Sequence, residues 1–70
     1  GYMDYFEVYK TVWNFHKKYA AEIENTEQFW DAVIEESRTI YKQYNKSKFV
    51  KDLLVACISE LERKGKERNN

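Results

Sequence analysis

The segment from Tyr2 to Ile23 carries more large apolar surface than one face of a helix can hold. At the helical period its apolar and aromatic positions cover an arc of roughly 160°, whereas a surface helix usually buries a stripe of about 100°. A helix of this kind needs neighbours on more than one side. The positions in this arc are Tyr5, Phe6, Val8, Tyr9, Val12, Trp13, Phe15, His16, Tyr19, Ala20 and Ile23.

The length of the chain sets a second constraint, because 70 residues can build only a small hydrophobic core. A domain of this size buries only about 60% of the surface that its unfolded chain exposes, so its stability is marginal. A second chain that covered exposed aromatic side chains would stabilise the fold appreciably. The size and the wide apolar arc together favour assembly as a homodimer or with another protein.

Three helical patterns follow one another, and the chain contains no proline. They predict helices over about residues 3–22, 26–44 and 47–64, with Asn25 or Thr26 capping the second helix and Ser47 capping the third. Gly65 is expected to end the last helix, and residues 65–70 to form a frayed tail. Because both connections are short, consecutive helices should be antiparallel. The predicted fold is an all-α, single-domain, three-helix up-down-up bundle, assembled as a dimer.

The charge balance and the cysteine count limit the classes of function. Twelve Lys and Arg residues balance 12 Asp and Glu residues, so the chain lacks the long-range positive field of proteins that hold phosphate backbones or anionic membranes. A single Cys cannot form an internal disulfide. The sequence shows neither a secretory signal pattern nor a membrane-spanning stretch, and we therefore expect a cytoplasmic protein.

The residues with catalytic or metal-binding chemistry do not form a recognisable site. His16 and Cys57 are the minimum of a thiol catalyst, but both fall on apolar stripes where such residues usually pack in the core. A zinc site needs two further ligands that these stripes do not supply. Glu35 and Glu36 point about 100° apart on a helix and do not form an acid–base pair. We therefore expect no enzyme activity, no cofactor, no metal and no small-molecule substrate.

The wide arc of the first helix has two interpretations: two helices of the same chain pack all of it, since Tyr can bury its ring and keep its hydroxyl in water, or part of it meets a second chain. We favour the second, in which the arc is divided between an interface and a core. The part predicted to meet a second chain consists of Tyr5, Val8, Val12, Phe15 and Tyr19, because interface cores concentrate aromatic residues. A second set of residues, drawn from all three predicted helices, is predicted to fill the core within one chain. They are Trp13, Trp30, Val33, Ile40, Leu54, Cys57 and Leu61.

A lysine cluster around the second turn supports an alternative function, a small nucleic-acid-binding regulator. Its members, with aromatic residues between them, could hold phosphates while the aromatic rings stack on bases. The alternative is a structural role, in which these lysines keep a turn solvated and form ion pairs with Asp4 and Glu7. The outward face of the third helix argues against groove reading, because Asp52 and Glu62 lie on it. The cluster comprises Lys42, Lys46, Lys48 and Lys51, with Tyr41, Tyr44 and Phe49 between them.

Four segments carry a resemblance to a known group of proteins: WNFHKKY at residues 13–19, FWDAV at 29–33, FVKDLL at 49–54 and ELER at 60–63. Taken in order, they resemble short uncharacterised helical proteins of Gram-positive bacteria, often encoded on prophages or other mobile elements. The resemblance implies a bacterial cytoplasmic accessory protein. Such proteins have no established activity, so the resemblance transfers no site residue. The expected function is non-catalytic interaction with another chain.

Overall fold

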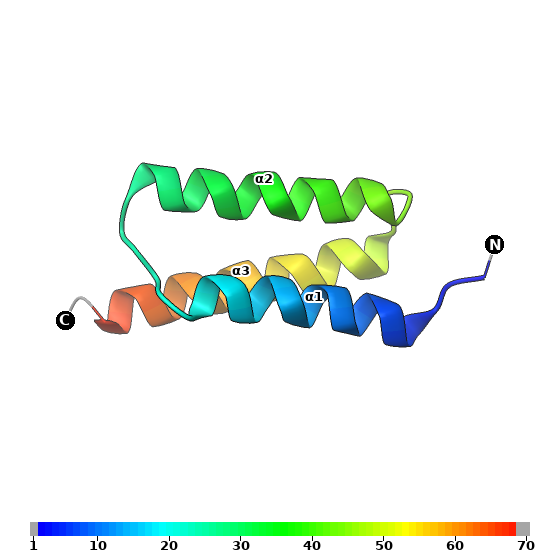
Figure 1. Ribbon diagram of the computed structural model, residues 1–70, viewed down its shortest axis with the longest axis horizontal. Helices are drawn as coiled ribbons and strands as arrows, with labels where there is room; N and C mark the ends of the chain where they lie inside the picture. The colour runs from blue at the N-terminus through cyan, green and yellow to red at the C-terminus, as the bar shows by residue number, and fades with distance from the viewer. Residues whose placement is uncertain (1, 69–70) are drawn as a thin grey trace.

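The computed structural model describes residues 2–68 and contains three helices (Figure 1). They are α1 (Tyr5–Ala20), α2 (Glu27–Gln43) and α3 (Lys48–Arg68). No strand occurs within the described residues. The predicted all-α, three-helix class is confirmed.

The contacts between helices show the direction of each one. Thr11 of α1 lies beside Tyr44 of α2, whereas Lys18, two turns further along α1, pairs with Glu36. Residue numbers therefore rise along α1 as they fall along α2. The ring of Tyr5 contacts Phe49 near the start of α3. Figure 1 shows the chain reversing at each connection, so that α3 runs alongside α1 in the same direction.

Each helix begins at a side chain that accepts a hydrogen bond from the first turn, as N-terminal caps do. Asp4 caps α1 with an oxygen-to-nitrogen distance of 3.2 Å, and Thr26 caps α2 at 3.1 Å. Ser47 does the same for α3 at 3.3 Å. The sequence allowed either Asn25 or Thr26 at the second start, and the structure uses Thr26. The backbone donors are the N–H groups of Glu7, Phe29 and Val50.

The turn between α2 and α3 is closed by two backbone hydrogen bonds. The N–H of Lys46 donates to the carbonyl of Tyr41, and the N–H of Asn45 donates to that of Lys42. This pair of bonds is the Schellman arrangement that ends many helices. Asn45 and Lys46 both have left-handed backbone angles, with φ of 57° and 60°. Asparagine tolerates this region, whereas lysine does so at a cost in free energy.

The core lies along the line where the three helices meet. Every helix contributes to it, and β-branched or Leu side chains dominate it. Among the described residues, Phe15 is the one aromatic side chain that is fully buried, with 1% of its surface exposed. The buried apolar residues are Val8, Val12, Phe15, Val33, Ile40, Val50, Leu54 and Leu61.

The end of α3 differs from the prediction. The helix continues through Gly65 to Arg68, so the predicted end at residue 64 and a frayed tail from residue 65 are wrong for residues 65–68. Gly65 is buried, and a Cβ atom built on it would lie 3.2 Å from Cγ2 of Ile23 in the α1–α2 connection. The glycine lets Ile23 pack closely against α3, and it does not end the helix. Residues 69 and 70 of the predicted tail lie outside the described residues.

Replacing Lys46 by glycine is expected to stabilise the protein. Glycine adopts a positive φ without the steric cost of a side chain, about 1–2 kcal/mol, although it also loses more backbone freedom on folding. We expect the free energy of unfolding in urea to rise by roughly 0.5 kcal/mol in Lys46→Gly. The matched control Gln43→Gly, in the last turn of α2, should lose about 1 kcal/mol. Destabilisation by Lys46→Gly would contradict the left-handed turn.

Candidate functional site

Helix α1 carries two apolar stripes side by side, and only one of them is covered by α2 and α3. The covered stripe contains Val8, Val12 and Phe15, which are 0%, 5% and 1% exposed. The second stripe remains uncovered within the chain. Its residues are Tyr5 (59% exposed), Phe6 (73%), Tyr9 (55%) and Trp13 (59%). We call this stripe, together with the exposed Tyr2 (95%) that precedes the helix, the aromatic face.

The aromatic face extends from α1 onto the start of α3. The rings of Tyr5 and Tyr9 meet Phe49 edge to face, with centroid distances of 5.5 and 5.8 Å. Further along α1, the Trp13 ring lies 6.2 Å from that of His16. Aromatic pairs with these separations are mutually attractive, so three of the exposed rings are held in place by neighbours. The aromatic face is a formed surface rather than a set of independent side chains.

A hollow of about 530 Å³ lies on the same side of the molecule, between the second half of α1 and the second half of α3. Its apolar wall contains Ala20, Ile23 and Leu61, and its charged rim contains Glu60 and Lys64. A hydrogen bond from Arg63 is the main cause that lowers the pKa of Glu60, against the weaker opposing effect of desolvation. The rim is therefore charged at neutral pH. His16 and Glu67 complete the lining.

The structure divides the predicted interface residues into three groups. Tyr5 is exposed, Tyr19 is partly buried, and the remaining three lie in the core of their own chain. Conversely, Trp13 was expected in the core but is 59% exposed. On α1 the core face carries two valines and one phenylalanine, and the short valines let the helices approach closely. Most of the other rings on α1 stay more than half exposed. The three predicted interface residues that instead lie in the core are Val8, Val12 and Phe15.

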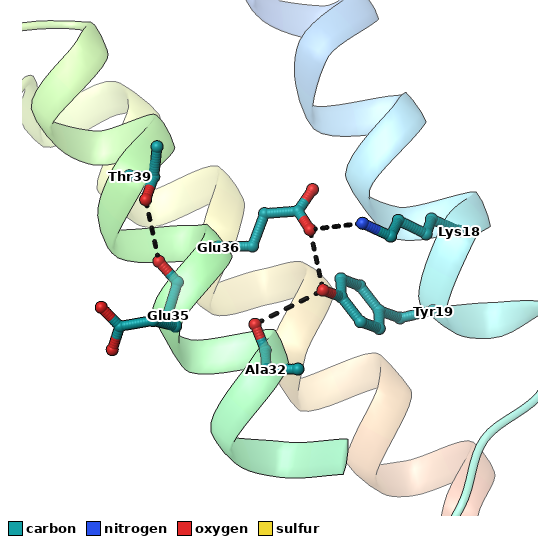
Figure 2. A network of polar contacts seen from close by, with 6 residues as sticks. All are labelled: Lys18, Tyr19, Ala32, Glu35, Glu36 and Thr39. Atoms are coloured by element: carbon teal, nitrogen blue, oxygen red, sulfur yellow. Dashed lines mark hydrogen bonds and ion pairs between the residues drawn. The ribbon is translucent and has the colours of Figure 1, made fainter. Parts of the chain in front are cut away.

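Polar side chains join α1 to α2 at the side of the core (Figure 2). Lys18 Nζ lies 2.8 Å from Glu36 Oε1, and the Tyr19 hydroxyl donates to the same oxygen at 2.7 Å. Burial alone would raise the pKa of the Glu36 carboxyl. The hydrogen bonds from Lys18 and Tyr19 and the charge of Lys18 outweigh it, so this pKa lies below its ordinary value. Helical periodicity does not reveal this network, because the network depends on the register between α1 and α2.

The lysine cluster lies at the end of the molecule where α2 meets α3. Lys48 pairs with Asp52 of its own helix at 2.8 Å, and the other three lysines are exposed. Among the described residues, no ion pair joins the cluster to Asp4 or Glu7. The aromatic residues between the lysines face inward: Tyr41 and Tyr44 pack against the core, and Phe49 lies under Tyr5 and Tyr9. The cluster therefore presents charge without free rings.

The residues with nucleophile or metal-ligand chemistry are dispersed. His16 lines the hollow, whereas Cys57 packs against the core, where burial raises the pKa of its thiol. A raised thiol pKa disfavours the reactive thiolate. Within residues 2–68, no three His, Cys, Asp or Glu side chains are grouped so that they could hold a metal ion.

No protein-family model, no curated protein and no solved structure matches the chain. Among the described helices, none has the length and apolar character needed to cross a membrane.

The Glu36 network should make stability depend on acid pH. The pKa of Glu36 is lower in the folded chain than its ordinary value of 4.5, so the carboxylate contributes stability above that pH and loses it as the pH falls through the folded pKa. In urea, the free energy of unfolding of Glu36→Gln should be lower than that of the original chain at pH 7, and the difference should be smaller at pH 3. The control is Glu35→Gln, whose carboxylate faces solvent. An equal deficit at both pH values would contradict the network.

Proposed function

We propose that this chain is a non-catalytic protein-interaction module that forms a homodimer through the aromatic face of α1. The observation that carries the proposal is the exposure of Phe6 and Trp13, two of the largest apolar side chains, on a helix whose other stripe is fully packed. Large exposed apolar patches with a polar surround usually mark sites of association. Trp and Tyr are also enriched among the residues that dominate binding energy.

The area of the aromatic face is close to what a stable dimer buries. One aromatic side chain has about 150–250 Å² of surface, so at the observed exposures the five residues present on the order of 600 Å² per chain. Specific interfaces bury about 800 Å² on each partner. The backbone and neighbouring side chains around these rings supply the remainder.

A second copy is the occupant we favour, because it presents the same surface and brings no net charge. The formal net charge is 0, so two copies approach without long-range repulsion. A symmetric pair is also the commonest form of association between identical chains. A bacterial cytoplasmic accessory protein built as an up-down-up bundle is the setting that this proposal assumes, in line with the single Cys and the resemblance noted above.

Trp13→Ala should convert a dimer into a monomer. Truncating this ring removes a large part of the contact area without opening a cavity in the chain's own core. Sedimentation equilibrium over a hundredfold concentration range should show the loss of association, while circular dichroism shows retained helix. The control Val55→Ala removes an exposed apolar side chain of α3 outside the aromatic face and should dimerise normally. Association of Trp13→Ala with unchanged affinity would contradict the proposal.

Nucleic-acid binding by Lys42, Lys46, Lys48 and Lys51 is the alternative proposal. It is favoured by one observation: three of these lysines are exposed, and no ion pair among the described residues engages them. Binding of a DNA duplex should then weaken steeply with added salt. The double variant Lys42→Glu with Lys51→Glu should abolish it. A flat titration at low salt would remove this alternative.

A further inference from the structure

The side of the molecule that α1 shares with α3 has a projection at one end and a recess at the other. The projection is the set of rings around Phe6 and Tyr9 on the first half of α1. The recess is the hollow of about 530 Å³ beside Ala20, on the second half of the same helix. The volume is within the range of about 300–1,000 Å³ that accommodates ligands of drug size, so it has room for an aromatic side chain.

The spacing of these two features makes the surface complementary to itself. Phe6 and Ala20 are each seven positions from Trp13, a distance of about 10 Å along a helix. A twofold axis near Trp13 and perpendicular to α1 would therefore bring Phe6 of each chain over Ala20 of the other. In such a symmetric contact, every projection of one chain meets the recess of its partner.

We propose that the dimer is antiparallel, with the Phe6 and Tyr9 rings of each chain seated in the hollow between α1 and α3 of the other. This inference rests on the proposed function, and it adds the orientation and the site that receives the rings. The apolar wall formed by Ala20, Ile23 and Leu61 takes the ring faces. The charged rim gives the Tyr9 hydroxyl polar partners, as such hydroxyls usually have when they are buried.

A parallel dimer through the same surface would make fewer packing contacts. It would press the projecting rings of the two chains together at one end and leave the two hollows facing each other at the other end. Facing hollows lose the packing contacts that stabilise an interface. Ala20 is small and exposed, so it lets a partner's ring approach the helix backbone. The antiparallel arrangement fills the hollow and separates the projections.

Disulfide cross-linking tests the orientation. Phe6→Cys and Ala20→Cys are each made on a Cys57→Ser background whose dimerisation is first confirmed by sedimentation. In the antiparallel dimer, the two copies of residue 6 are about 21 Å apart, as are the two copies of residue 20. A disulfide needs Cα atoms within about 7 Å. We expect each variant alone to form little cross-linked product on oxidation, and the equimolar mixture to cross-link extensively between residues 6 and 20.

Self-cross-linking of either variant, with no excess in the mixture, would overturn the antiparallel arrangement while leaving dimerisation intact. A monomeric Cys57→Ser background would instead count against the proposed function itself. A second variant keeps the orientation testable if the loss of the Phe6 ring weakens association. Ala20→Leu should raise the dimer Kd roughly tenfold or more, because its side chain occupies the space of the partner's ring.

The control Ala32→Leu enlarges an exposed alanine on α2, away from the hollow, and should leave the Kd unchanged. In a parallel dimer the added side chain of Ala20→Leu would meet its own copy and add apolar contact. An unchanged or lowered Kd for Ala20→Leu would therefore contradict the antiparallel proposal.

Discussion

The structure depends on the packing of Val8, Val12 and Phe15 against α2 and α3. These side chains are short or fully enclosed, so three helices can approach closely around one stripe of α1. The two remaining helices cover that stripe and leave the residues of the aromatic face more than half exposed. A 16-residue helix with apolar residues over more than one face is therefore left with an uncovered surface.

The proposed function rests on that uncovered surface. The rings of Tyr5 and Tyr9 are held by edge-to-face contacts with Phe49, and the hollow beside Ala20 lies on the same side of the molecule. A small domain has a limited core, so covering these rings would add stability that the single chain lacks. In the proposed dimer, association and folding stability are therefore coupled through α1. The Lys18 and Glu36 network joins α1 to α2 within the chain.

Most of the fold is predictable from local sequence signals. Which face of α1 is buried against α2 and α3 is not. The caps at Thr26 and Ser47 are short-range signals: Ser47 is the predicted cap, and Thr26 is one of the two predicted alternatives. Gly65 was misassigned because its role depends on Ile23, far away in sequence. Trp13 was misassigned because helical periodicity identifies a wide apolar arc without showing which part faces the neighbouring helices. That division depends on how the three helices are placed against one another: Phe15 is buried and Phe6 is exposed, although they are the same residue type.

The mass of the unmodified chain in solution, measured by sedimentation equilibrium from low to high micromolar concentration, tests the central claim most directly. The chain has a mass of 8.5 kDa. Coverage of the aromatic face by a second copy predicts a reversible rise from this mass to twice its value, with no larger species. A mass that stays at the single-chain value throughout the range would contradict self-association through α1.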